Sequence, residues 1–240
     1  MLLKYLLLFA IIFSAIFLSI KKKKLTILGA FTGGLLAFFI FYCAGFTGVF
    51  MLGAFFLMAT FATVFKINIK QQLNAAEKSG GKRTTNQVIA NGGMAGIVGL
   101  IGGLYPAENT LFTLMMAASL SAATADTLSS ELGTLYGKRF YNIINLKNGI
   151  RGENGVVSLE GLLIGIAGSL VIAFIYAMVL GFNLYFIIII IAGTIGNIVD
   201  SILGATLEKK QYLNNDMVNF LNTLSAAICA WFCASFLNYL

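Results

Sequence analysis

Eight long apolar stretches, separated by short polar segments, restrict this chain to the folds of membrane proteins. Most of them approach the roughly 20 residues that a helix needs to cross the hydrocarbon core of a bilayer. With 59% hydrophobic and 10% charged residues, the composition is that of a polytopic membrane protein. We therefore predict an all-α integral membrane protein with about eight transmembrane helices in a single domain, residues 1–240. The expected spans are 2–20, 25–44, 46–65, 88–105, 110–125, 156–180, 184–199 with an extension toward 207, and 218–237.

The first stretch shares one feature with a signal peptide, because Lys4 precedes a long apolar run. No small-residue cleavage site follows this run, and the chain continues into four consecutive lysines at 21–24. We interpret residues 1–24 as a retained first helix that ends in a basic cytoplasmic stop.

The basic residues predict the orientation, because short cytoplasmic loops carry most of the Lys and Arg in membrane proteins. Fifteen of the sixteen lie in alternate loops, and Lys4 is the exception. We therefore expect a prokaryotic cytoplasmic membrane protein with both termini outside. The basic loop residues are Lys21, Lys22, Lys23, Lys24, Lys66, Lys70, Lys78, Lys82, Arg83, Lys138, Arg139, Lys147, Arg151, Lys209 and Lys210.

The net charge of +7 is thus concentrated on one membrane face, where it favours contact with anionic lipid of the bilayer. The short basic loops contain no interleaved aromatic residues, which argues against nucleic acid as a partner. The chain has no histidine, which excludes an imidazole base, a phosphohistidine intermediate and histidine-based zinc or haem sites. The three cysteines lie within apolar stretches, where we expect them to pack.

Two aspartates, Asp126 and Asp200, each stand at the trailing end of a long uncharged stretch. A carboxylate in a membrane span costs roughly 3 kcal/mol or more unless it is paired, metal-bound or exposed to a wet cavity. Eight of the nine acidic residues fall near the predicted cytoplasmic face, and only Glu108 lies on the other side. We expect the cytoplasmic loops 66–87, 126–155 and 208–217 to carry a functional site.

Small and polar residues recur every three or four positions near the cytoplasmic ends of four stretches, so each set lies on one helix face. The pairs Gly161-xxx-Gly165, Gly29-xxx-Gly33 and Gly99-xxx-Gly103 are expected to pack helices closely. Packing gives no reason to place carboxylates among several amides, so the sets with Asp or Asn favour a binding site. These sets include Thr84, Gln87 and Asn91; Asn154 and Ser158; Asn197, Asp200, Ser201 and Glu208; and Asn215, Asn219 and Asn222.

A weak internal repeat points to helical hairpins. Two similar segments, Asp126-Thr-Leu and Asp200-Ser-Ile, close apolar stretches, whereas similar segments from Asn86, Asn154 and Asp216 open others. Such hairpins, repeated around an axis near the membrane normal, would each bring an acidic helix end and a polar helix start to the cytoplasmic surface.

Carboxylates beside basic residues, without histidine, are typical of a Mg²⁺-dependent phosphate site. Helix starts that contain Asn or Gly add backbone N–H groups, which favour anions. An acceptor that is itself a phosphate monoester is largely dianionic near neutral pH and needs no strong general base. The task of such a site is to overcome the repulsion between two anions, so the missing histidine is no obstacle.

Four ordered motifs resemble the integral-membrane family that contains transmembrane protein 19 and plant phytyl-phosphate kinase. They begin at Ala123, Gly152, Gly196 and Asn214 and read ATADTLSSELG, GENGVVSLEG, GNIVDSILGAT and NNDMVNF. A further segment, KRTTNQ at 82–87 followed by NGG at 91–93, also matches. The resemblance covers residues 25 to 238 and extends more distantly to dolichol kinases and phosphatidate cytidylyltransferases.

The resemblance implies a kinase that phosphorylates an isoprenoid monophosphate, such as phytyl or geranylgeranyl phosphate, to the diphosphate. The donor would be a nucleoside triphosphate, with CTP favoured. The family commonly has Thr where this chain has Glu153, and an aromatic residue plus alanine where Leu128 and Ser129 stand. These departures adjoin the expected site, so the acceptor or the nucleotide can differ from those of the family.

For such a reaction we expect Asp126, Glu131 and Asp200 to be the catalytic carboxylates and to bind Mg²⁺. On an ideal helix Asp126 and Glu131 are about 140° apart, so they share a metal only if the helix ends or bends between them. Otherwise Asp126 pairs with Asp200, and Glu131 faces the nucleotide or caps a loop. The expected nucleotide- or phosphate-binding residues are Lys82, Arg83, Thr84, Asn86, Asn91, Arg151, Asn154, Ser158, Asn197, Ser201, Asn215, Asp216 and Asn219.

Two other functions fit the same pattern. An ion-coupled transporter would use these carboxylates to bind a cation or proton, and it would place them near the bilayer centre. A non-catalytic membrane scaffold would tolerate a change of carboxylate to amide. The oligomeric state stays open, with a homodimer among the alternatives.

Overall fold

Eight α-helices make up most of the described chain, which comprises residues 2–73 and 81–238 of a computed structural model. Glu77 and Lys78 of the predicted loop 66–87 lie outside the described residues. A 3₁₀ turn, η1 (Pro106–Glu108), precedes α5, and a π-helical turn, η2 (Gly204–Glu208), follows α7. The α-helices are α1 (Leu2–Lys21), α2 (Ile27–Val64), α3 (Ile67–Gln72), α4 (Thr85–Leu104), α5 (Asn109–Tyr136), α6 (Leu159–Leu180), α7 (Leu184–Leu203) and α8 (Asn215–Asn238).

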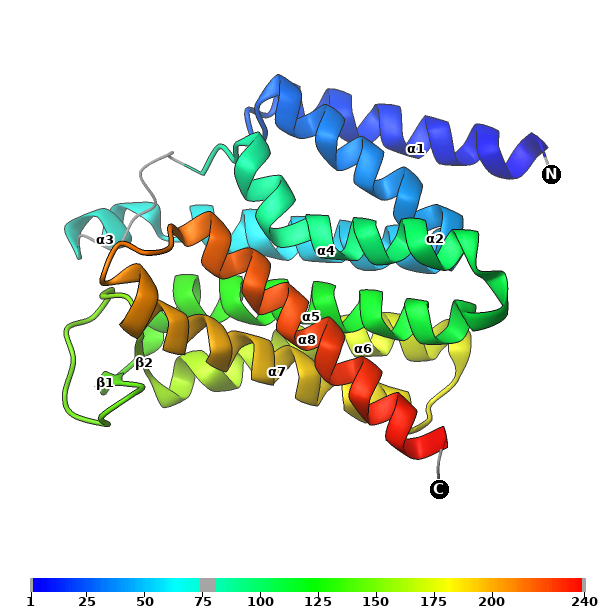
Figure 1. Ribbon diagram of the computed structural model, residues 1–240. Helices are drawn as coiled ribbons and strands as arrows, with labels where there is room; N and C mark the ends of the chain where they lie inside the picture. The colour runs from blue at the N-terminus through cyan, green and yellow to red at the C-terminus, as the bar shows by residue number, and fades with distance from the viewer. Residues whose placement is uncertain (1, 74–80, 239–240) are drawn as a thin grey trace.

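Seven helical segments of the described chain are long and apolar enough to cross a membrane, which confirms the prediction of an all-α polytopic protein. One of them, α2, has 38 residues and is interrupted at Gly45, whose φ of 60° and ψ of −147° are not helical. The two arms of α2, 27–44 and 46–64, correspond to the second and third predicted spans. In Figure 1 the first arm runs toward the end that carries both termini, and the second arm returns.

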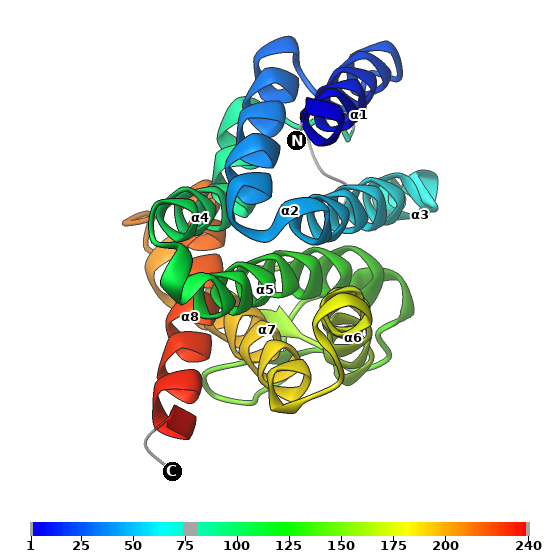
Figure 2. The same cartoon turned by 90° about the vertical axis from the view of Figure 1, so that its right-hand side faces the viewer.

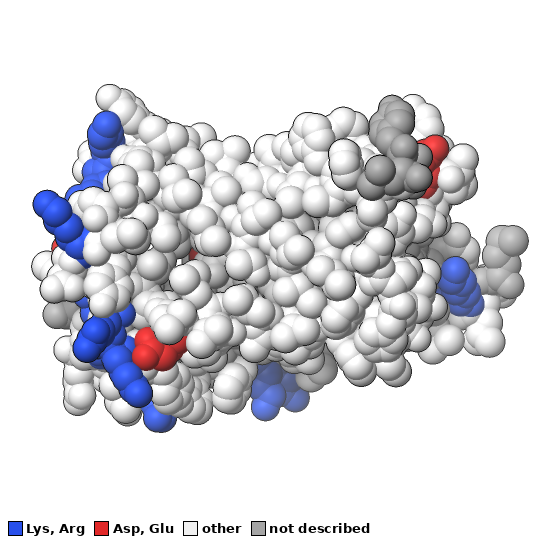
Figure 3. All heavy atoms as spheres, turned by 90° about the horizontal axis from the view of Figure 1, so that it is seen from below, with Lys and Arg blue, Asp and Glu red and all other residues white. Residues whose placement is uncertain are grey.

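The helix connections gather at two ends of the molecule. The loop end contains the segments 22–26, 66–73, 81–84, 137–158 and 209–214, whereas the far end contains both termini and the turns at 105–108 and 181–183 (Figure 1). Most of the basic side chains visible in Figure 3 lie at one end of the molecule. This arrangement agrees with the alternation of basic loops in the sequence.

Helix α5 forms the centre of the bundle and packs against α2, α4, α6, α7 and α8 (Figure 2). Its middle is rich in fully buried small residues, including Ala117, Ala118 and Ala122, which allow the neighbouring helices to approach. On α6, a Cβ added to Gly161 would lie 3.1 Å from the carbonyl oxygen of Ser129 in α5. This close approach confirms the predicted packing role of the Gly161-xxx-Gly165 pair.

The same close packing joins α2 to α4. A Cβ on Gly99 would lie 2.8 Å from the carbonyl oxygen of Phe39, and one on Gly29 would lie 3.4 Å from that of Arg83. These glycines of the Gly99-xxx-Gly103 and Gly29-xxx-Gly33 pairs therefore lie where helices meet, as predicted.

The start of α4 is fixed to the turn between α1 and α2. The Arg83 amide donates to the Lys24 carbonyl at 2.9 Å, and the Thr26 amide donates to the Arg83 carbonyl at 3.0 Å. Thr84 then caps α4 in a capping box with Gln87. The backbone of this turn therefore holds Arg83 beside the first two helices.

Candidate functional site

The carboxyl groups of Asp126 and Asp200 meet where α5 packs against α7 near the loop end. The two side chains lie within hydrogen-bonding reach of each other. The Asn222 side-chain amide of α8 donates to Asp200 at 3.5 Å. Arg83, only 9% exposed, interacts electrostatically with Asp126. Residues that are far apart in the sequence thus form one charged cluster.

A polar cavity of about 650 Å³ surrounds this cluster. Its volume lies within the range of about 300–1,000 Å³ that is common for small-molecule sites. The residues that form its wall come from the ends of α4, α5, α7 and α8 and from the segment 137–158 before α6. Of the site residues predicted from the sequence, the cavity brings together Arg83, Asn91, Asp126, Glu131, Asn154, Ser158, Asn197, Asp200, Ser201, Asn215 and Asn219.

Five predicted residues are not part of the cavity wall: Lys82, Thr84, Asn86, Arg151 and Asp216. Lys82 and Asn86 are exposed, and Asp216 lies in the first turn of α8. The Thr84 hydroxyl accepts a hydrogen bond from the Gln87 amide and caps α4. Arg151 donates to the Gly137 carbonyl at 3.2 Å, and its guanidinium lies 4.7 Å from the centre of the Phe140 ring. In this structure Thr84 and Arg151 therefore stabilise a helix start and a loop.

The segment 137–158 forms one wall of the cavity. Strands β1 (Tyr141–Asn142) and β2 (Val156–Val157) pair antiparallel within it, and the Ser158 hydroxyl caps α6 by accepting from the Gly161 amide at 3.1 Å. Gly155 has a φ of +75° and packs so closely on Ala205 that an added Cβ would clash with its backbone. This contact holds Asn154 beside η2, where its side chain lies next to the Glu208 carboxylate.

Helix α5 continues without a break through Asp126 and Glu131 to Tyr136, so the predicted loop 126–155 begins only after this helix. The condition under which Asp126 and Glu131 would share a metal is therefore not met. Among the described residues, no group of three or more Asp, Glu, Cys or His side chains forms a metal cluster. Asp126 and Asp200 are instead the carboxylates that lie together.

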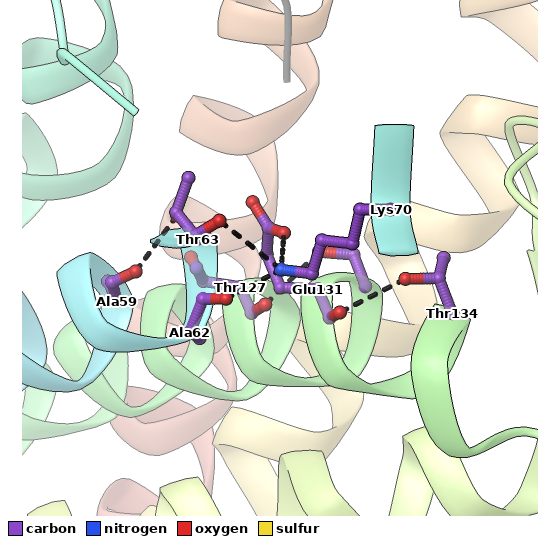
Figure 4. A network of polar contacts seen from close by, with 8 residues as sticks. Ala59, Ala62, Thr63, Lys70, Thr127, Glu131 and Thr134 are labelled. Atoms are coloured by element: carbon purple, nitrogen blue, oxygen red, sulfur yellow. Dashed lines mark hydrogen bonds and ion pairs between the residues drawn. The ribbon is translucent and has the colours of Figure 1, made fainter. Parts of the chain in front are cut away.

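Glu131 forms an ion pair with Lys70 of α3, at 2.5 Å (Figure 4). Lys70 is fully buried, and its ammonium also donates to the carbonyls of Ala62, at 2.6 Å, and Thr63, at 3.4 Å. These carbonyls belong to the last turn of α2, where no later helical turn supplies N–H groups to donate to them. Lys70 thus links the end of α2 to the edge of the cavity.

Several residues of the site were not assigned to it from the sequence. Gln87, Glu208 and Asn222 lie on the polar helix faces recognised there, so helical periodicity could have identified them. Glu153 lies inside a recognised motif and also lines the cavity. Lys70 was counted only as a loop charge, because no local pattern connects it to a glutamate 61 positions away.

Comparison with known proteins finds relatives of the chain in plants, bacteria and archaea. It is 34% identical to the Arabidopsis thaliana protein VTE6, chloroplastic, over 78% of this chain and 58% of that protein, so it spans little more than half of that relative. It is also 34% identical to an uncharacterized membrane protein of Synechocystis, over 86% of this chain and 82% of the relative. An uncharacterized membrane protein of Methanocaldococcus jannaschii is 29% identical, over 88% of this chain and 87% of the relative.

No solved structure matches the chain. The family model described as integral membrane protein DUF92 matches residues 10–227, which include every side chain of the polar cavity. This family model matches most of the chain, and the chain resembles its relatives over most of its length. The chain therefore belongs to the DUF92 family of integral membrane proteins.

Proposed function

We propose that this protein is a membrane kinase that transfers a phosphoryl group from a nucleoside triphosphate to an isoprenoid monophosphate and so forms the diphosphate. The observation that carries the proposal is the facing pair of Asp126 and Asp200 in a polar cavity beside Arg83. The motifs that resemble prenyl-phosphate kinases supply many residues of the cavity wall, which supports the same reaction.

The reaction needs no strong base. An oxygen of the acceptor monophosphate bonds to the γ-phosphorus of the donor, and the bond from that phosphorus to the bridging oxygen of the β-phosphate breaks. A dianionic acceptor and a tetra-anionic donor become two trianionic products, so no net proton is released. The barrier arises largely from charge repulsion, which a cation such as Arg83 reduces at the edge of the cavity.

The residues around the aspartate pair fit Mg²⁺. Asp126 and Asp200 offer carboxylates from two helices, and the buried Oδ1 atom of Asn222 has no hydrogen-bond partner among the described residues. Mg²⁺ at phosphate-transfer sites is usually held by one or two carboxylates together with substrate phosphates and water. We therefore propose Asp126 and Asp200 as its ligands. When bound, the ion would neutralise charge on the phosphoryl group in transfer.

Amide side chains from several helices would orient the two substrates. Asn91, Asn197, Asn215 and Asn219 extend from α4, α7 and α8 to the cavity wall, and Asn154 reaches it from the segment before α6. Helices α4, α6 and α8 also begin at the loop end, so the positive ends of their dipoles favour phosphate there. We propose CTP as the donor, as the motif resemblance implies.

Nucleotide turnover by the purified protein tests the proposal. The wild type is assayed with phytyl or geranylgeranyl phosphate and with CTP, ATP, GTP or UTP. Asp200→Asn should lower turnover by about 100-fold or more, because it removes a charge that only the bound metal or the transition state uses. The matched control, Glu108→Gln, changes a carboxylate at the far end and should leave turnover unchanged.

Two results would refute the proposal. One is a wild type that turns over no nucleotide with any acceptor, and the other is an Asp200→Asn variant of full activity. Ion flux across proteoliposomes without nucleotide consumption would favour the transporter instead.

A further inference from the structure

A second cavity, of about 420 Å³, lies between α1, both arms of α2 and the start of α4. Its wall is apolar along nearly all of its length and includes Ile12, Leu36 and Phe55. Along α1 it extends from Ser19 to Ile11, a distance of about 12 Å toward the bilayer interior. We call it the apolar cavity.

The apolar cavity meets the polar cavity at two residues, Arg83 and Gln87, which contribute to the walls of both. The guanidinium of Arg83 lies 5.6 Å from the centre of the Phe55 ring, which belongs to the apolar wall. The same group interacts with the Asp126 carboxylate of the polar cavity. A buried cation therefore stands at the junction of a hydrocarbon-lined space and a charged one.

The polar atoms of the apolar cavity are confined to one end. Of the described residues, only Arg83, Gln87 and Ser19 contribute polar side chains to its wall, and these three lie near the loop ends of α1 and α4. The Ser19 hydroxyl is already used, since it donates to the Ala15 carbonyl at 2.6 Å. The distribution of polar and apolar residues in the wall therefore matches an amphiphile with an apolar chain and an anionic head.

We infer that the apolar cavity binds the isoprenoid chain of the acceptor and that Arg83 holds the acceptor phosphate at the junction with the polar cavity. The identity of the ligand rests on the proposed function, whereas its place rests on the two cavities. Arg83 and the Asp126–Asp200 pair then face the phosphate from opposite sides.

Gly53, in the second arm of α2, offers a way to block the cavity. It lies in the cavity wall, and a Cβ added there would meet no atom within 4 Å. Gly53→Leu should therefore fill the space without a clash against the backbone, whereas Gly53→Ala adds one methyl group and serves as the matched control. Gly33→Leu, on the first arm, fills the same cavity from another side, and its Cβ would lie 4.0 Å from Val88.

The experiment uses a prenyl monophosphate that carries a photoreactive diazirine on its chain. The full-length protein in lipid nanodiscs is irradiated with this probe, and the labelled peptides are identified by mass spectrometry. Label is expected on α1, α2 and the start of α4. Gly53→Leu or Gly33→Leu should reduce it by about tenfold or more, since overfilling a packed site costs about 1–3 kcal/mol. Gly53→Ala should keep most of it.

Binding and catalysis are separated by Asp200→Asn, which should keep the label and lose nucleotide turnover. Label without turnover in the wild type would refute the proposed function and leave the binding site intact. Turnover with long-chain acceptor that survives both leucine variants would refute the binding site and leave the kinase. Label mainly on α6 and α7 would also overturn the inference.

Discussion

Lys70 is a fully buried lysine whose ammonium has three acceptors, the Glu131 carboxylate and the carbonyls of Ala62 and Thr63. A lysine has three N–H donors, so the buried charge is both paired and fully hydrogen-bonded. Such a group contributes mainly through the cost of removing either partner, because the other is then left buried and uncompensated. Its effect reaches the polar cavity, since Glu131 is part of the cavity wall.

Lys70→Met is expected to destabilise the fold by about 3–5 kcal/mol, since it leaves Glu131 and two helix-end carbonyls without their donor. Thermal unfolding in detergent, followed by size-exclusion chromatography, measures the loss. Lys209→Met, at an exposed position, is the control. The double variant Lys70→Met/Glu131→Gln should lose less stability than the sum of the losses of the two single variants, because the two side chains are coupled. Strict additivity would contradict the ion pair.

The shape of helix α2 depends on a single glycine. A straight helix of 38 residues would be about 57 Å long, nearly twice the hydrocarbon thickness of roughly 30 Å. The break at Gly45 divides it into two arms of membrane length, and the arms enclose the apolar cavity together with α1 and α4. The backbone there has a φ of 60° and a ψ of −147°, a region that side chains other than glycine rarely occupy.

Gly45→Ala should therefore destabilise the protein by about 1–3 kcal/mol through backbone strain alone. The added methyl group itself meets no atom within 4 Å, so a steric clash does not contribute. Gly53→Ala is the matched control within the same helix, because its site is equally open but helical. There alanine should be neutral or stabilising by up to about 1 kcal/mol. Equal shifts of the unfolding temperature for both variants would disprove the special role of Gly45.

Helical periodicity allowed much of the arrangement to be predicted. The spacing of Asn197 and Asp200 placed both on one face of α7, and the structure brings that face to the polar cavity. Helix ends were harder, because the run from Asp126 to Tyr136 is polar enough to read as a loop, yet packing against α6 keeps it helical. The Lys70–Glu131 pair depends on how α3 folds back on α5, which no local sequence pattern encodes.

The reversal of α2 decides how the charges are distributed between the two ends of the bundle. With two arms, the chain crosses eight times between the two ends, and the basic segments at 21–24 and 66–70 lie at the same end (Figure 1). If α2 crossed only once, those two segments would lie on opposite faces. Only the reversed arrangement puts Arg83, the four lysines at 21–24 and the polar cavity on one face.

Cysteine labelling tests this topology in a background in which Cys43, Cys229 and Cys233 are replaced by alanine. The chosen sites are exposed: Lys22→Cys, Gln71→Cys and Asn145→Cys at the loop end, and Phe182→Cys at the far end. Because basic loops stay in the cytoplasm, a membrane-impermeant maleimide should label only Phe182→Cys in intact cells. The other three should react after permeabilisation.

The pattern of labelling separates two kinds of error. Labelling of Asn145→Cys in intact cells would show that the orientation is the opposite of the one predicted. The polar cavity would then face away from cytoplasmic nucleotide. Lys22→Cys and Gln71→Cys reacting from opposite sides would instead show that α2 crosses once. In that case the two arms could not enclose the apolar cavity, so the proposed chain site would fail while the aspartate pair on α5 and α7 would stand.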